Sequence, residues 1–187
     1  MLNYNSAIIE EKIYSGLTVK EIFPVMKLNL RGKSRDFLTT IGKNINMILP
    51  MEANTSSSSD NYTSMWLSPD EWMLVSNSTI DKENNTYKIE ELLFNKISKT
   101  KLGAVTDVSD QFVMLDLKGD KIFDLLSAGC PFNFNEFKTK KGAVAQTLLI
   151  QIDVIMYLKE LNSLNLFVRR SFSEHLMSWI DDAASRL

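Results

Sequence analysis

The sequence is poor in the residues that build common catalytic and metal sites. Its 187 residues contain one cysteine, Cys130, and one histidine, His175. A single cysteine excludes an intrachain disulfide and a cysteine-rich zinc site, and it suits a reducing cytoplasm. A hydrolytic triad or a histidine-bound metal would have to use His175, which has no nucleophile motif or acid pair near it in the sequence. We interpret His175 as a structural or interface residue and Cys130 as a buried thiol, with catalytic roles as the alternative.

Patterns that bind nucleotides, nucleic acids or membranes are also missing. Gly119, Gly129 and Gly142 fit neither a Walker motif nor a dinucleotide-binding motif. The formal net charge is -2, from 21 basic and 23 acidic residues, which argues against a general nucleic-acid binder. No apolar run reaches the roughly 20 residues of a membrane span, and the acidic N-terminal segment does not resemble a signal peptide. We expect a cytoplasmic protein that binds neither nucleic acid nor membrane.

The pattern of apolar residues predicts an α+β fold. Short strands alternate with helices but do not form long, regular βαβ crossovers, which favours small mixed or antiparallel sheets with packed helices. We divide the chain into an N-terminal α+β subdomain, residues 1–100, and a C-terminal α+β subdomain, residues 101–187. The length of 187 residues and the 44% hydrophobic content suit two subdomains packed as one globular unit.

Local motifs predict where several elements begin and end. Ser34 is placed to cap a helix that follows it, and residues 68–71 predict a turn between two strands. Gly129 predicts a helix end in the left-handed conformation. The last helix is expected to begin at a capping box of Ser171 and Glu174. Its predicted buried face comprises Phe172, Leu176, Trp179, Ile180 and Ala183.

Two groups of residues are candidates for a partner interface. The first is the irregular loop that carries Phe132, Phe134 and Phe137; such aromatic side chains either pack onto the core or meet another chain, and both alternatives are open. The second is the pair Arg169 and Arg170, at a strand end before a helix. This pair suits an anion or an acidic partner surface, with simple solvation as the alternative. We predict no catalytic, cofactor-binding or metal-binding residue in this chain.

Three segments together resemble a known family. Residues 105–131 read as strand, turn, strand, tight turn, helix and stop, residues 66–75 as a strand hairpin, and residues 167–179 as a strand leading into a helix. In this order and spacing they resemble the small gamma subunit of heterotetrameric sarcosine oxidase. The residues that carry the resemblance include Trp66, Pro69, Asp70, Trp72, Asp107, Ser109, Gly119, Asp120, Gly129, Pro131, Arg169, Arg170, Ser171, Glu174, His175 and Trp179.

The resemblance implies both a fold and a function. The fold would be like the folate-binding domain of the aminomethyltransferase of the glycine cleavage system. The function would be that of a non-catalytic, structural gamma subunit in a multi-subunit flavoenzyme that oxidatively demethylates sarcosine to glycine. Its partners would be the alpha, beta and delta subunits. FAD, FMN, NAD, tetrahydrofolate and zinc are implied for the other subunits of the complex, and none for this chain.

The resemblance also leaves alternatives. A folate-binding or aminomethyltransferase-like one-carbon transfer domain is the second hypothesis, and a stand-alone interaction module is the third. The predicted hairpin at residues 148–154 retains one acidic residue, Asp153. It lacks the paired acids and the glycine-containing turn typical of the folate enzymes, which speaks against the second hypothesis.

Overall fold

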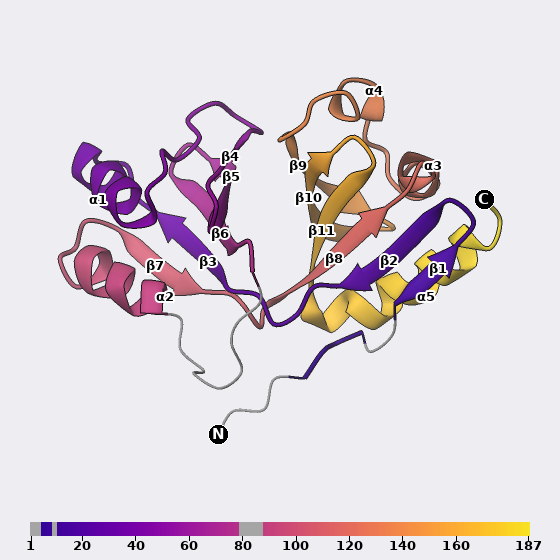
Figure 1. Ribbon diagram of the computed structural model, residues 1–187, viewed down its shortest axis with the longest axis horizontal. Coiled ribbons are helices and arrows are strands. Elements are labelled where there is room, and N and C mark those ends of the chain that lie inside the picture. Colours follow the sequence, from indigo (N-terminus) through magenta and orange to yellow (C-terminus); the bar gives the residue numbers. More distant parts are fainter. Residues whose placement is uncertain (1–4, 9–10, 79–87) are drawn as a thin grey trace. The chain divides into compact units, whose positions relative to one another are not determined.

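A computed structural model describes residues 5–8, 11–78 and 88–187. Over these residues the protein is α+β, with two antiparallel sheets and accompanying helices (Figure 1). The described residues divide into two compact units, the first within residues 24–110 and the second within residues 5–23 and 111–187. The predicted fold class is therefore confirmed.

In residues 24–78 and 88–110, the first unit is a five-stranded antiparallel sheet with helices on one face (Figure 1). Its strands are β3 (Lys27–Arg31), β4 (Ser56–Ser58), β5 (Tyr62–Ser68), β6 (Glu71–Ser76) and β7 (Ala104–Asp107), in the spatial order β4-β5-β6-β3-β7. Its helices are α1 (Arg35–Ile45), α2 (Lys88–Leu93) and the π-helix η1 (Phe94–Ser98). Phe37 and Ile41 of α1 and Ile97 of η1 meet the sheet in one core.

Across residues 11–23 and 111–187, the second unit is a six-stranded antiparallel sheet. Its strands are β1 (Lys12–Tyr14), β2 (Leu17–Glu21), β8 (Phe112–Lys118), β9 (Val144–Leu149), β10 (Ile152–Glu160) and β11 (Ser163–Arg169), in the order β1-β2-β8-β11-β10-β9. Its helices are α3 (Ile122–Ser127), α4 (Phe134–Phe137), the 3₁₀ turn η2 (Arg170–Phe172) and α5 (Ser173–Ala184). Apolar residues of α3 and α5 share one core with alternate residues of β8, β10 and β11.

The two units differ from the predicted division at residue 100. Strands β1 and β2 belong to the second unit, because β2 pairs with β8, Thr18 lying opposite Lys118. Strand β7 belongs to the first unit, because it pairs with β3. The pairing of β2 with β8 and of β7 with β3 joins strands that are distant in sequence, so linear order could not assign β2 and β7 to their units. The packing of the two units as one globular body stays a prediction.

Position 129 has no space for a side chain, which is why it is a glycine. The left-handed conformation predicted for Gly129 is wrong. The glycines with positive φ are Gly16, Gly119 and Gly142. A Cβ atom at Gly129 would lie 2.6 Å from Cζ2 of Trp179 and 2.8 Å from Cγ2 of Ile150. The Gly129 carbonyl also accepts a 2.9 Å hydrogen bond from the Ile150 amide. The end of α3, the β9–β10 turn and α5 therefore approach one another only because residue 129 has no side chain.

The start of α5 also differs from the prediction. Ser171 and Glu174 are exposed, and the chain instead makes the 3₁₀ turn η2, where the Ser173 hydroxyl donates a 2.8 Å hydrogen bond to the Arg170 carbonyl. The tighter turn changes the angular spacing and leaves Phe172 44% exposed. The predicted face is right for Leu176 and Ile180, which are buried, whereas Trp179 and Ala183 are partly buried.

The predicted irregular loop around residues 132–137 contains a short helix and an aromatic cluster, defined here as Phe123, Phe132, Phe134 and Phe137. Asn133 caps α4 by accepting a 3.1 Å hydrogen bond from the Asn135 amide. The ring centroids of the cluster lie 5.2–6.4 Å apart in tilted or edge-to-face contacts. Phe134 and Phe137 are 6% and 5% exposed and belong to the core. Of the two alternatives for these two rings, the structure supports core packing.

Truncating the buried rings of the aromatic cluster should destabilise the protein. Phe134→Ala and Phe137→Ala should each lower the free energy of unfolding by about 3–5 kcal/mol, since each leaves a cavity among rings that cannot fully collapse. Chemical denaturation followed by circular dichroism measures the change. Phe172→Ala is the matched control, because that ring is 44% exposed, and its midpoint should stay near the wild-type value. Equal midpoints for all of the variants would contradict the burial of Phe134 and Phe137.

Adding a methyl group at position 129 should destabilise the protein, and the size of the effect should depend on the side chain at position 179. Gly129→Ala should lower the free energy of unfolding by about 1–3 kcal/mol, the usual cost of overpacking. In a Trp179→Leu background the same substitution should cost less, because the smaller side chain leaves room for the methyl group. A double-mutant cycle from denaturation curves measures this coupling, and strict additivity would show that the two positions do not compete for space.

Candidate functional site

The residues that could carry catalysis lie apart from one another or are buried. His175 is exposed on α5, and Cys130 is buried with its Sγ atom 3.7 Å from Oγ1 of Thr147. Within residues 5–8, 11–78 and 88–187, no group of three or more His, Cys, Asp or Glu side chains could hold a metal ion. The helices of the same residues include none long and apolar enough to cross a membrane.

The hairpin of β9 and β10 does not form a polar pocket around Asp153. Asp153 is exposed, and its cross-strand partner is Leu148, which is 45% exposed. The turn between the strands consists of Ile150 and Gln151 with φ of 47° and 68°. Glycine and asparagine favour these left-handed angles, whereas a β-branched isoleucine is strained there. The contact of Ile150 with Gly129 holds the turn in this conformation.

The predicted interface residues end up in different environments. Phe134 and Phe137 lie in the core, and Phe132 is partly buried beside them. Arg169 is exposed at the end of β11. Arg170 is partly buried, and its Nη2 atom donates a 2.6 Å hydrogen bond to the carbonyl of Asn5, which ties the N-terminal segment to the second unit. Arg169 is therefore the fully exposed member of the predicted set, and Phe132 and Arg170 keep part of their surface accessible.

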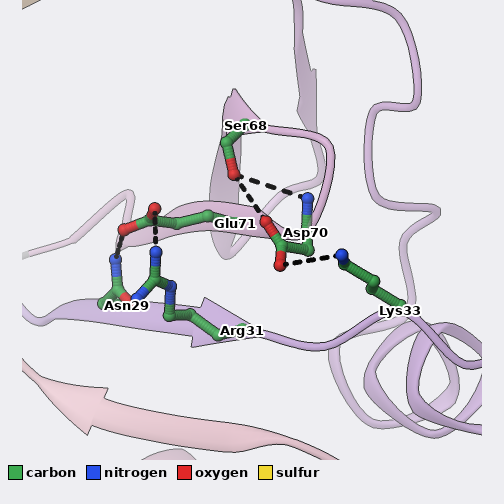
Figure 2. A network of polar contacts seen from close by, with 6 residues as sticks. All are labelled: Asn29, Arg31, Lys33, Ser68, Asp70 and Glu71. Carbon is green, nitrogen blue, oxygen red and sulfur yellow. Dashed lines mark hydrogen bonds and ion pairs between the residues drawn. The ribbon is translucent and has the colours of Figure 1, made fainter.

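Polar side chains gather where β3 meets the β5–β6 turn (Figure 2). Glu71 accepts hydrogen bonds of 2.7 Å from Asn29 and 2.9 Å from Arg31. Asp70 accepts 2.9 Å from the Ser68 hydroxyl and lies 3.6 Å from the Lys33 ammonium. The Ser68 hydrogen bond, followed by the charge of Lys33, holds the pKa of Asp70 below its ordinary value.

This network fastens the predicted turn at residues 68–71. The ionised Asp70 carboxylate favours the folded state, and that stabilisation is lost as the pH falls through its lowered pKa. The Asp70 carbonyl also accepts a 3.0 Å hydrogen bond from the Gly32 amide. The carboxylates of Asp70 and Glu71 are both bound by partners within the fold. The arrangement therefore positions the β5–β6 hairpin, and neither carboxylate is free to react.

An open groove lies beside α1, and we call it the α1 groove. It has a volume of about 730 Å³ and is lined by Leu38, Thr39, Gly42, Lys43, Asn46, Met47, Ile48, Leu49 and Met51. Helix α1 ends at Ile45, and its C-terminal capping residue Asn46 adopts left-handed angles. The chain then continues along the helix, with Leu49 buried and Ile48 and Met51 83% and 63% exposed.

The sequence gives only a partial signal for the α1 groove. An apolar run from Met47 to Met51, interrupted by Pro50, follows the helix. An apolar run of this kind ordinarily predicts burial, and it does not tell which side chains face water. The structure places Leu49 and Pro50 inside and leaves Ile48 and Met51 outside, a separation that depends on contacts with β6.

Solved structures of other proteins share this fold. A chain of the heterotetrameric sarcosine oxidase from Corynebacterium sp. U-96, in complex with pyrrole 2-carboxylate, matches with a TM-score of 0.80 and 22% identity, over 91% of this chain and 84% of that chain. The glycine cleavage system aminomethyltransferase T from Bartonella henselae matches with a TM-score of 0.62 and 12% identity, over 88% of this chain and 45% of that chain. The predicted likeness to the aminomethyltransferase fold is confirmed.

Sequence comparison agrees with the fold. The sarcosine oxidase subunit gamma of Corynebacterium sp. (strain U-96) is 27% identical over 121 residues, which are 65% of this chain and 55% of that relative. This match thus spans about half the length of the relative. The model of the family "Sarcosine oxidase, gamma subunit family" matches residues 31–186, most of the chain. The chain therefore belongs to the sarcosine oxidase gamma subunit family.

Proposed function

We propose that this chain is the non-catalytic gamma subunit of a multi-subunit flavoenzyme that oxidatively demethylates sarcosine to glycine. The match of the gamma subunit family to residues 31–186 carries the proposal. The ion pairs of the acidic side chains support a structural role for this chain. Asp70, Glu71 and Asp116 each form an ion pair with a neighbouring basic side chain, at 3.6, 2.9 and 3.1 Å, and do not converge on an open site.

The partners we propose are the alpha, beta and delta subunits of the same enzyme. FAD, FMN, NAD, tetrahydrofolate and zinc would be held by those subunits. The described part of this chain does not fit a zinc site, since it lacks a cluster of three metal-ligating side chains. A cytoplasmic location accords with the single cysteine and stays a prediction.

The predicted interface at residues 132–137 and 169–170 stays a proposal, and we now limit it to the residues that keep accessible surface. Phe134 and Phe137 would have to leave the core to reach another chain. Phe132 and Arg169 keep accessible surface, and the Arg169 guanidinium suits a carboxylate on a partner subunit.

The hypothesis of a non-catalytic gamma subunit and the hypothesis of a folate-binding domain predict different behaviour for the purified chain. We expect the chain alone to be colourless and to produce no peroxide from sarcosine. Co-expressed with the alpha, beta and delta subunits of the same source, it should co-purify with them in equal amounts in an oxidase that does produce peroxide. Absorbance spectroscopy, a peroxide assay and size-exclusion chromatography measure the three properties.

Each contrary result has a distinct meaning. Flavin absorbance or peroxide from the chain alone would contradict the non-catalytic role. Micromolar tetrahydrofolate binding by calorimetry that is lost in Asp153→Ala, and kept in the control Asp182→Ala on α5, would favour the folate-binding domain. An active oxidase that forms from the other subunits and excludes this chain would contradict membership of the complex.

A further inference from the structure

We propose that the α1 groove is a docking site for another subunit of the oxidase, and that it receives an apolar segment of that subunit flanked by a carboxylate. The inference rests on the proposed function and adds to it a surface and the chemistry of the partner. The groove belongs wholly to the first unit of the chain, residues 24–110. It is distinct from the predicted interface residues, which belong to the second unit.

The groove is held in a fixed form by contacts on both sides. On one side α1 is anchored in the core by Phe37, Ile41 and Ile45, which are 0–3% exposed. On the other side the Met47 amide donates a 3.1 Å hydrogen bond to the Gly42 carbonyl, and Leu49 is 3% exposed. Neither wall is a free loop tip, so a partner would meet a preformed surface and lose little conformational entropy in binding it.

The indole of Trp72 fixes the outer wall. Its Nε1 atom donates a 2.7 Å hydrogen bond to the Pro50 carbonyl, and Trp72 itself is 1% exposed. Because Leu49 and Pro50 point inward, Ile48 and Met51 on either side of them point into solvent. Their exposure, 83% and 63%, is imposed by the buried residues between them.

The lining favours a protein segment over a small molecule. Small-molecule sites usually enclose the ligand and aim several polar groups at it. Here the polar lining residues Thr39, Lys43 and Asn46 are all exposed. Apolar side chains that project into water beside a groove are typical of protein interfaces, and the methionines Met47 and Met51 can adapt to the shape of a partner. An amphipathic helix laid into the groove is the binding mode that fits this surface.

Charge favours another subunit over a second copy of this chain. Lys43 carries the single full charge among the nine lining residues. In a symmetric dimer the same patch faces itself, so two Lys43 ammonium groups would share one interface with no acidic lining residue to offset them. A partner segment that carries Asp or Glu beside its apolar residues matches both the charge and the apolar surface.

Charged substitutions at the exposed apolar positions test the proposal in the complete complex. The chain is co-expressed with the alpha, beta and delta subunits, with an affinity tag on the alpha subunit. Ile48→Glu/Met51→Glu should weaken retention of this chain about tenfold or more, as expected for loss of interface hot spots. Ile48→Leu/Met51→Leu is the matched control and should be retained like wild type. Lys43→Glu should also weaken retention, whereas Lys43→Arg should not.

The outcomes separate this inference from the proposed function. If wild type and Ile48→Glu/Met51→Glu are retained equally, the docking site is overturned and the proposed function stands. If wild type itself is not retained, the proposed function fails and the inference fails with it. If sedimentation of the isolated chain shows a dimer that Ile48→Glu/Met51→Glu abolishes, the occupant is a second copy and the proposal is overturned. The thermal unfolding midpoints of the isolated variants should equal that of wild type, which excludes misfolding as the cause of weaker retention.

Discussion

The first unit depends on the hydrogen bond between the Trp72 indole and the Pro50 carbonyl. A tryptophan that is 1% exposed needs a partner for its N–H group, because an unsatisfied buried donor is costly. The 2.7 Å bond to Pro50 supplies that partner. It also fastens the chain after α1 against the sheet, and the Phe37 ring lies 6.1 Å from the indole. The hydrogen bond joins β6 to the segment that follows α1, and the ring contact joins β6 to α1 itself.

In the second unit, polar contacts likewise hold elements together. The Tyr14 hydroxyl donates a hydrogen bond to Asp181 and joins edge strand β1 to helix α5. Burial, then this hydrogen bond, raises the pKa of Tyr14, so the phenol stays neutral as a donor. Asn165 of β11 donates a hydrogen bond to the buried Asp116 of β8, and Lys118, also on β8, forms an ion pair with it. Ionisable groups tied into such pairs serve packing, which agrees with the proposed structural role.

The two candidate surfaces differ in how their apolar side chains are held. In the aromatic cluster, edge-to-face contacts among Phe123, Phe132, Phe134 and Phe137 satisfy the rings within the chain. At the α1 groove, Ile48 and Met51 flank two buried residues and are themselves exposed. An apolar surface that the described part of the chain leaves exposed is the better candidate for contact with another chain.

The sequence by itself determined the fold class, the family, and local features set by short-range chemistry. Ser34 caps α1 as predicted, accepting a 3.0 Å hydrogen bond from the Phe37 amide, and residues 68–71 turn where the proline and aspartate indicate. Tertiary structure alone decided the placement of β2 and β7, the reason for Gly129, and the inward or outward direction of Phe134 and Ile48. These features depend on contacts between residues far apart in the chain. Residue type and periodicity describe a side chain's preference for burial, whereas the space left by distant neighbours decides whether that preference is met.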